Sequence, residues 1–261
     1  MIRLGEATWP VAYEIYRRHE AFFPLIAAVL GDRQNGAVFA DRVDVPRRIY
    51  VEHAFGFAQL FGEDNAGFDE SLRRYLLLDR AFAPAKVRLY TPDEPEFLRG
   101  SLFDRERSER RRFVLDANHL GNPGSLPPSA GAGIEIRAAR VADVTAIDDG
   151  FGVVRRFWRN DGDFVASSLA VVAWDGGRPA AICYAAAVAD GQVEVDVLTQ
   201  PEYRGKGLGR SVVLAFTARC LESGLKPAWD CFTNNAGSMA LARSCGFVPA
   251  CPAYPFYTLG K

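Results

Sequence analysis

The sequence predicts an α/β (α+β) protein made of two α/β units joined by a linker. Three observations lead to this prediction. Apolar residues recur at helical spacing in some stretches and alternate with polar residues in others, so helices and strands are interspersed along the chain. Residues 117–133 are dense in Gly, Pro, Ser and Asn, the composition of a linker, and they separate residues 1–116 from residues 134–261. Residues 192–213 change from strand-like alternation to helical spacing across a glycine-rich turn.

Composition limits the classes of function. With 261 residues, of which 49% are hydrophobic and 24% charged, the chain is typical of a globular protein. A formal net charge of -1 gives no support for a nucleic-acid or membrane-surface partner, and the early apolar run, residues 21–30, is too short to span a membrane. The five cysteines have no CxxC or CxH spacing, so we expect no disulfide framework, no metal and a cytoplasmic location.

The first unit, residues 1–116, reads as an N-terminal α/β domain. Residues 11–23 have helical spacing, Pro24 restarts a short second helix and Gly31 ends it. The following elements are expected to be a hairpin of residues 37–40 and 47–54, its aromatic continuation at 55–61, a helix at 68–78 and a strand at 87–91. The mixed-charge run at residues 104–112 is interpreted as a solvated helix end or loop.

The second unit, residues 134–261, begins with a strand and a helix and continues with a hairpin. The expected elements are a strand at 134–137, a helix at 141–149, an irregular aromatic and basic stretch at 150–164, and hairpin strands at 169–174 and 179–188. The strand, turn and helix of residues 192–213 come next, and Gly224 ends that helix. A buried strand at 228–232, a helix between Asn235 and Gly246, and a last pair of strands in the tail complete the unit.

The stretch 192–213 carries the clearest functional signal. Three glycines in five residues, Gly205, Gly207 and Gly209, precede a helix, and a glycine turn at a helix N-terminus binds anions through its N–H groups and the helix dipole. We therefore expect a ligand that carries phosphate. The turn is not a nucleotide P-loop, because no Ser or Thr follows Lys206, and its GxGxG pattern is not the GxGxxG of a dinucleotide site.

The turn resembles motif A of the GNAT N-acetyltransferase superfamily, [QR]xxGxG/A, with Arg204, Gly207 and Gly209 in the defining places. IRAARVADV at the start of the second unit is similar to the superfamily's IRxAxxxD opening, and the order of elements is also similar. The separated motifs EVDVLT, PAWDCFTNN and NxxSxxLAxxxGF resemble the zwittermicin-resistance type of GNAT acetyltransferase. This resemblance implies a GNAT fold, a mixed and mostly antiparallel sheet flanked by helices. The order of elements in residues 1–116 hints at a degenerate GNAT-like half without the glycine turn.

The resemblance implies acetyl-CoA as cosubstrate. The turn amides would hold its pyrophosphate, and the backbone at the end of the preceding strand would bind its pantetheine arm. Arg210 is equally consistent with ordinary surface charge, and Asn235 and Ser238 with simple helix capping. The candidate cofactor-binding residues are Val197, Leu198, Thr199, Arg204, Gly205, Lys206, Gly207, Leu208, Gly209, Arg210, Ser211, Asn235 and Ser238.

Glu194 and Asp196 are the candidate catalytic residues. Strand alternation places both carboxylates on one face of a central strand, where a carboxylate needs a partner or a function. We expect Glu194, with Asp196 as second choice, to accept the proton of the attacking amine or to hold the substrate ammonium; the alternative is that both form structural ion pairs with arginine. In many GNAT enzymes a Tyr of the last helix protonates the leaving thiolate, but Ala242 stands at that place. Water, Ser238, Tyr254 and Tyr257 remain open as the acid.

These features predict an acetyl-CoA-dependent N-acetyltransferase that acts on a primary amine of a small molecule by direct transfer in a ternary complex. The first unit and the aromatic stretch at residues 151–158 would frame the acceptor site. Two alternatives stay open: a non-catalytic acyl-CoA-binding or regulatory module, motivated by Ala242, and a peptide or protein N-acetyltransferase. No feature of the sequence indicates an oligomeric state.

Overall fold

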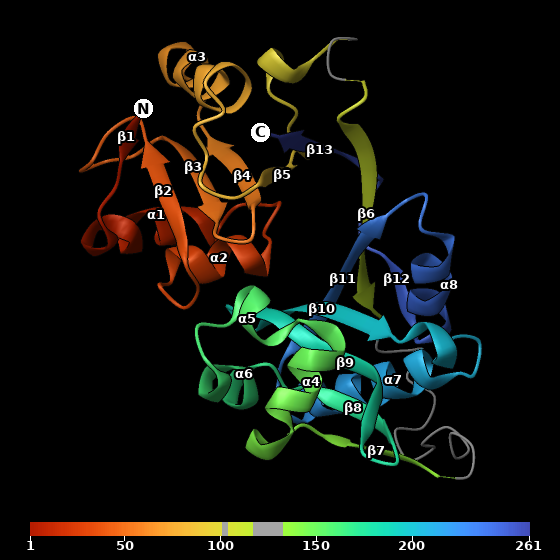
Figure 1. The fold of residues 1–261 in the computed structure, drawn as a ribbon. Helices are drawn as coiled ribbons and strands as arrows, with labels where there is room; N and C mark the ends of the chain where they lie inside the picture. The colour runs from red at the N-terminus through yellow and green to blue at the C-terminus, as the bar shows by residue number, and fades with distance from the viewer. Residues whose placement is uncertain (101–103, 117–132) are drawn as a thin grey trace. The chain divides into compact units, whose positions relative to one another are not determined.

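The computed structural model describes residues 1–100, 104–116 and 133–261 (Figure 1). The chain forms two compact units: unit 1 comprises Met1–Arg110 with Ala253–Lys261, and unit 2 comprises Arg111–Pro252. The expected linker, residues 117–133, lies outside the described residues apart from Gly133. The unit boundaries therefore differ from the division expected from composition, because the C-terminal tail belongs to unit 1.

Unit 1 is an α/β unit with a mostly antiparallel set of strands. Its strands are β1 (Ile2–Arg3), β2 (Gly36–Ala40), β3 (Arg48–His53), β4 (Phe57–Gly62), β5 (Lys86–Tyr90), the first residues of β6 (Arg107–Leu115) and β13 (Tyr254–Gly260); its α-helices are α1 (Trp9–Tyr16), α2 (Pro24–Leu30) and α3 (Ala66–Arg73). Every residue of α2 is buried, which explains its unbroken apolar sequence, and Pro24 begins the helix where no backbone N–H is needed. The side chain of Asn65 caps α3 by accepting from the N–H of Phe68.

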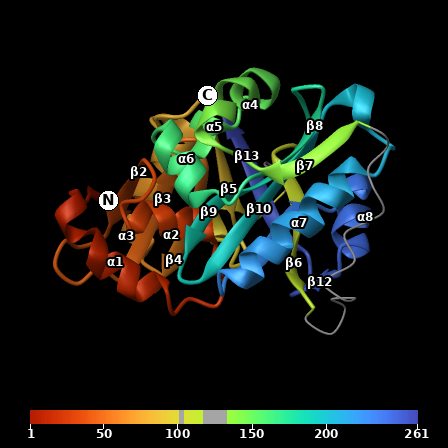
Figure 2. The ribbon, with the colours of Figure 1, turned by 90° about the horizontal axis from the view of Figure 1, so that it is seen from below.

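Unit 2 has the mixed α/β fold expected from the sequence. Its strands are the last residues of β6, β7 (Ile134–Ala138), β8 (Val171–Asp175), β9 (Arg178–Ala189), β10 (Gln192–Thr199), β11 (Lys226–Phe232) and β12 (Phe247–Pro249); its α-helices are α4 (Val144–Phe151), α5 (Val154–Phe157), α6 (Asp161–Ser167), α7 (Leu208–Glu222) and α8 (Ala236–Ser244). Figure 2 shows α7 running alongside β10, and α7 packs against β8, β9 and β10. The buried side chains Val212, Phe216 and Cys220 of α7 recur at the spacing of one helix face.

The two units share one strand order. In unit 1, β1, β2, β3 and β4 are successive antiparallel neighbours and β5 is parallel to β4. In unit 2, β7, β8, β9 and β10 are successive antiparallel neighbours and β11 is parallel to β10. In each unit the parallel pair is connected through a helix, α3 or α7. This common order supports the expectation that the first unit is a GNAT-like half.

Three local predictions are corrected. Most of the mixed-charge run at residues 104–112 lies in the paired strand β6, where Arg110 is buried and Ser108 is half-buried between the exposed Arg107 and Glu109. β4 is a separate strand rather than a continuation of β3, since Gly56 turns the chain at φ 94°. The two tail strands do not form a pair: β12 pairs with Leu115–Phe113 of β6 in unit 2, whereas β13 pairs with β5 and with Arg107–Arg110 of β6 in unit 1.

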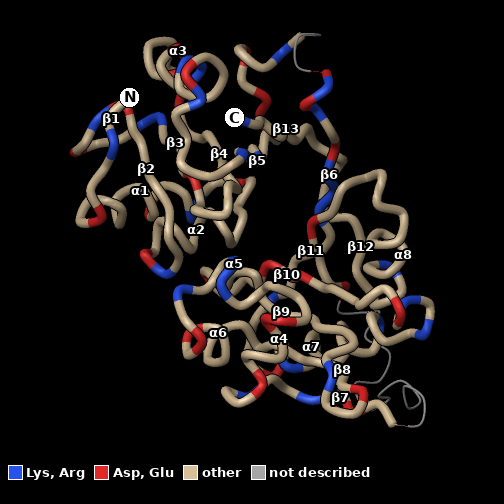
Figure 3. Tube along the Cα trace, in the orientation of Figure 1, with Lys and Arg blue, Asp and Glu red and all other residues tan. Residues whose placement is uncertain are grey.

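Within the described ranges, no helix is long and apolar enough to cross a membrane. The same residues hold no group of three or more His, Cys, Asp or Glu side chains arranged to bind a metal ion. Figure 3 shows Lys and Arg scattered over both units rather than gathered on one element.

Candidate active site

The site begins where β10 and β11 separate. Parallel pairing between them runs from Gln192–Lys226 to Val195–Trp229, whereas β10 stays paired with β9 as far as Thr199. We call residues 196–199 of β10 and 230–232 of β11 the fork. The register between β10 and β9 shifts between Glu194 and Val195, immediately before the fork. Such a bulge increases local twist, which accounts for the divergence of β10 from β11.

Backbone amides of β10 line one side of the fork. The N–H of Gln200 donates to Ala180 O of β9 at 2.9 Å. Because successive N–H groups of a strand point in opposite directions, those of Val197 and Thr199 point away from β9, and that of Leu198 points toward it. Of the three backbone positions expected to bind pantetheine, Val197 and Thr199 are therefore the two that face the fork.

The glycine turn lies directly after β10. Gly205 and Gly207 have φ of 74° and 80°, a left-handed conformation that glycine adopts without strain. Gly207 is the N-cap of α7 and has no side chain that could cap it, so the first N–H groups of the helix face outward. A Cβ at Gly209 would lie 3.2 Å from Oγ1 of Thr199, which shows how closely the helix start approaches the end of β10. The turn thus has the geometry of an anion site.

The basic residues of the turn are exposed and only weakly engaged. Arg204 Nε donates to Thr199 O at 3.3 Å, and Arg210 Nε donates to Ser244 O at 3.2 Å. Lys206 Nζ lies 5.0 Å from the centre of the Tyr203 ring. Long exposed side chains of this kind can turn toward a phosphate at low cost. Leu208, by contrast, is buried in the core, and Ser211 Oγ donates to Gly207 O within the helix.

Asn235 and Ser238 have structural partners. Asn235 Oδ1 caps α8 by accepting from Ser238 N–H at 3.0 Å, and Ser238 Oγ accepts from Trp229 Nε1 at 3.0 Å. The capping interpretation of both residues therefore has direct support. Their link to Trp229 is relevant to the site, since Trp229 is the last residue of β11 that pairs with β10.

Glu194 is held in a buried ion pair. Its Oε2 lies 3.3 Å from Nη2 of Arg112, and only 6% of its side chain is exposed. Nη1 of Arg112 also lies 3.9 Å from Oδ2 of Asp230, whose side chain is fully buried. One guanidinium from β6 therefore reaches two carboxylates on β10 and β11 at the base of the fork. This is the arrangement expected under the structural ion-pair alternative for Glu194.

Asp196 lies in the fork and is more accessible. Its side chain is 33% exposed. Oδ2 accepts from the phenol of Tyr184 on β9 at 2.6 Å and lies 3.7 Å from Nη1 of Arg156 on α5. Oδ1 accepts from the N–H of Val197 at 2.9 Å. Of the two carboxylates, Asp196 is the one that an acceptor molecule in the fork can reach.

The tyrosines considered as general acids lie in unit 1. Tyr254 and Tyr257 belong to β13, and the phenol of Tyr257 donates to Glu94 and to Leu98 O. Burial and the Glu94 carboxylate raise the pKa of Tyr257 to about 12. Ala242, at the place of the usual tyrosine, is the fully buried residue of α8.

Three residues that contact Glu194, Asp196 or Asp230 were not singled out from the sequence: Arg112, Tyr184 and Arg156. Arg112 belongs to the mixed-charge run, where charge alone suggested solvent exposure, and Tyr184 lies in an apolar strand whose cross-strand partner the sequence does not reveal. Arg156 and Trp158 come from the aromatic stretch expected to form a wall of the site. The indole N–H of Trp158 donates to Ala185 O of β9, next to Tyr184, at 3.1 Å.

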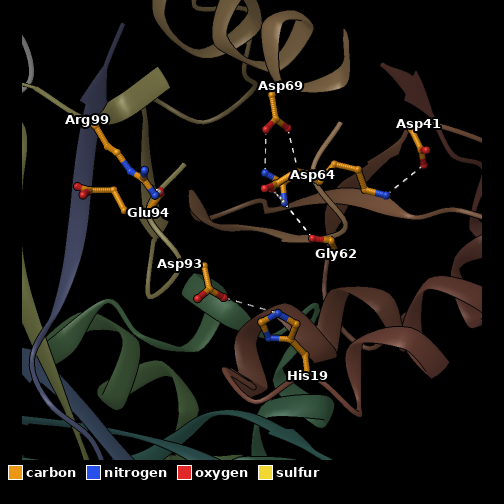
Figure 4. A network of polar contacts seen from close by, with 9 residues as sticks. His19, Asp41, Gly62, Asp64, Asp69, Asp93, Glu94 and Arg99 are labelled. Carbon is orange, nitrogen blue, oxygen red and sulfur yellow. Dashed lines mark hydrogen bonds and ion pairs between the residues drawn. The ribbon is translucent and has the colours of Figure 1, made fainter. Parts of the chain in front are cut away.

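The corresponding turn of unit 1 is acidic and capped. The β4–α3 connection carries Glu63 and Asp64 where the β10–α7 connection has basic residues, and Asn65 caps α3. Both oxygens of Asp69 accept from the Arg48 guanidinium, at 2.9 and 2.8 Å. A cleft of about 710 Å³ borders this turn, and Figure 4 shows the carboxylates of Asp64, Asp69, Asp93 and Glu94 around it. Negative charge and a capped helix do not suit a phosphate group.

Comparison with known proteins agrees with this geometry. The model of the GNAT acetyltransferase family matches residues 20–257. The uncharacterized N-acetyltransferase YdfB of Bacillus subtilis (strain 168) is 24% identical over 226 residues, which cover 85% of each chain.

Two solved structures resemble the whole chain. The GCN5-related N-acetyltransferase-like protein of Streptococcus suis 89/1591 has a TM-score of 0.69 at 17% identity and covers 98% of this chain and 100% of its own. A tandem GNAT protein from the clavulanic acid biosynthesis pathway has a TM-score of 0.67 at 12% identity and covers 99% of this chain and 97% of its own. These likenesses agree in fold with the mixed, mostly antiparallel α/β architecture. Since the family model spans most of the sequence, the protein belongs to the GNAT acetyltransferase family and is an acyltransferase.

Proposed function

We propose that the protein transfers the acetyl group of acetyl-CoA to a primary amine of a small molecule, directly and within a ternary complex. The observation that carries this proposal is the continuity of two features on one strand. β10 separates from β11 at Asp196 and ends at Thr199. Residues 200–203 connect it to the glycine turn, which has no side-chain cap and leads into α7. A phosphate-binding turn and an open strand edge are what a long, phosphate-bearing acyl carrier requires.

The residues present fit acetyl-CoA. Gly205, Gly207 and Gly209 would present the turn amides to its pyrophosphate, with Arg204 and Lys206 adding positive charge. The N–H of Thr199 would bind the pantetheine arm or the acetyl carbonyl, whereas the N–H of Val197, which faces the same side, already donates to Oδ1 of Asp196. Acetyl-CoA supplies the activated acetyl carbon and a thiolate leaving group.

We assign the acceptor side to Asp196 rather than Glu194. Glu194 is almost fully buried against Arg112, whereas a third of the Asp196 side chain is accessible. In the proposed step the amine nitrogen forms a bond to the acetyl carbon and the carbon–sulfur bond breaks. The proton lost by the amine passes to Asp196, the thiolate sulfur takes a proton from water, and Asp196 returns its proton to the hydroxide so formed. Glu194 then has a structural role at the base of the fork.

For the subfamily, we propose the zwittermicin-resistance type. The motifs EVDVLT, PAWDCFTNN and NxxSxxLAxxxGF support it, as does the presence of an N-terminal half before the second unit. The acceptor would then be a small amine rather than a protein. Asn235 and Ser238 lie within these motifs, where their capping roles stabilise the start of α8.

The test is an acetyl-transfer assay on a panel of amines, with free CoA measured by a thiol reagent and the product by mass spectrometry. The panel includes diamines, amino sugars, amino acids and peptides. We expect acetylation of at least one small amine, and a large loss of kcat/KM in Asp196→Asn that Asp149→Asn, a control at an exposed aspartate of α4, does not share. Activity confined to peptides would contradict the small-molecule assignment.

A further inference from the structure

Of the two carboxylate oxygens of Asp196, Oδ2 already has two polar partners. Oδ2 accepts from the Tyr184 phenol at 2.6 Å and faces Arg156 at 3.7 Å, while Oδ1 accepts only the N–H of Val197 among the described residues, at 2.9 Å. A carboxylate has about four acceptor positions, two on each oxygen. One position on Oδ1 is therefore left for a further donor, on a side chain that is 33% exposed.

Tyr184 is placed to control this arrangement. It lies directly opposite Asp196 across the β9–β10 pair, and its side chain is completely buried, with its ring near those of Phe157 and Phe164. A fully buried phenol does not meet an acceptor in the fork; it acts through Asp196. Burial and the charge of Asp196 raise the pKa of the Tyr184 phenol well above its ordinary value of 10.0, so the phenol remains a donor across the neutral range.

The backbone next to Tyr184 is fixed from outside the sheet. Ala185 donates its N–H to Ser168 O at 2.7 Å and accepts from the indole of Trp158 at 3.1 Å. The pairing of β9 with β8 ends at Cys183, opposite Val171, so these two bonds supply hydrogen-bond partners for the β9 backbone beyond that pair. They hold β9 at the bulge opposite Val195, so the direction of the Tyr184 side chain is set by the fold rather than by Asp196.

We infer that Tyr184 is a positioning residue, whose O–H holds Asp196 ionised and turned so that Oδ1 meets the acceptor amine. This inference rests on the proposed function, in which Asp196 accepts the amine proton. The phenol keeps its own proton throughout: the proton from the amine nitrogen goes to Oδ1, and the thiolate sulfur is protonated by water.

The other groups that face Asp196 define the expected pH dependence. They are Arg156 on α5, Cys183 on β9 and Glu194 on the same strand; Glu194 is paired with Arg112, and burial raises the pKa of the Cys183 thiol. Tyr184→Phe removes the one O–H donor and leaves these charges in place. Loss of a hydrogen bond to a carboxylate disfavours its ionised form, so the carboxylate of Asp196 should be easier to protonate in this variant than in the parent protein.

The primary test does not depend on turnover. Carbon NMR of protein labelled at the aspartate carboxyl carbon follows the titration of Asp196, whose signal is identified by its absence in Asp196→Asn. We expect the midpoint to rise in Tyr184→Phe and to stay unchanged in Tyr50→Phe. Tyr50 is the matched control, because it is also completely buried and donates to a carboxylate, Glu52, at 3.0 Å in unit 1. An unchanged midpoint in Tyr184→Phe overturns the inference.

Kinetics then separate this inference from the proposed function. With the amine identified in the acetyl-transfer assay, the acidic limb of the kcat/KM profile should move to higher pH in Tyr184→Phe, with little change in the KM for acetyl-CoA. In the Asp196→Asn background, Tyr184→Phe should have no further effect on kcat. Full activity of Asp196→Asn would refute the proton-acceptor role but leave the NMR result valid. If Tyr184→Phe does not fold, Tyr184→Met, compared with Tyr50→Met, removes the same O–H.

Discussion

Replacing Arg112 with Met should destabilise unit 2 far more than the loss of an ordinary ion pair. The Arg112 guanidinium lies 3.3 Å from Glu194 and 3.9 Å from Asp230, and the three side chains are 11%, 6% and 0% exposed. The substitution keeps most of the packing volume but leaves two buried carboxylates without their shared cation. Breaking a buried pair from one side costs about 3–5 kcal/mol. We therefore expect the free energy of unfolding of unit 2 to fall by about that amount.

Arg178→Met is the matched control. Arg178 is also 3.3 Å from its partner, Glu202, but these side chains are 75% and 51% exposed, so the loss should be at most about 1 kcal/mol. Urea unfolding followed by tryptophan fluorescence measures both variants, since Trp158, Trp174 and Trp229 all lie in unit 2. Equal losses in the two variants would refute the reasoning.

Three further predictions concern the turn, the first unit and a buried histidine. Gly207→Ala places a side chain at a backbone φ of 80° and should weaken acetyl-CoA binding about tenfold in calorimetry. Gly191→Ala, at φ 72° in a hairpin away from the turn, should leave the affinity unchanged. Equal affinities of the two variants would contradict the role of the turn. Calorimetry should also give one acetyl-CoA per chain, because the acidic turn of unit 1 does not suit phosphate; a stoichiometry of two would show otherwise. Burial lowers the pKa of His53 from 6.5 to about 4. As the pH falls from 6.5 to about 4, His53 therefore becomes protonated in the unfolded chain but stays neutral in the folded unit. Stability should therefore decrease by up to about 1.4 kcal/mol per pH unit between these values, and His53→Gln should flatten that slope; an unchanged slope in urea unfolding would refute the assignment.

Local sequence patterns predicted most elements of unit 2, although residues 150–164, expected to be irregular, contain α5 and the start of α6. The glycine turn required Gly205 and Gly207 at positive φ and a helix after them, and both are present because few other residues adopt that backbone conformation. Alternation correctly made residues 192–199 a strand, and Asn235 caps α8 as its sequence position predicted. Such features depend on a residue and its neighbours in the chain, so the sequence alone is sufficient.

Pairing between distant segments could not be predicted in this way. The mixed charges of residues 107–112 gave no sign that Arg112 would reach Glu194, because that depends on β6 taking its place beside β11. The tail strand β13 was expected in the second unit, yet it pairs with β5 in unit 1. Strand alternation is the same whichever neighbour a strand acquires.

The sequence by itself determined that this chain carries a glycine-rich turn and a helix after a strand with two carboxylates, a pattern that resembles its family. Only the tertiary structure distinguished those carboxylates. Strand alternation places Glu194 and Asp196 on the same face. Glu194, however, forms a buried ion pair with Arg112 of β6, whereas Asp196 accepts from the Tyr184 phenol, beyond the last residue of β10 that pairs with β11. The physical reason is that burial and hydrogen-bond partners are set by where neighbouring strands end, which no local pattern records.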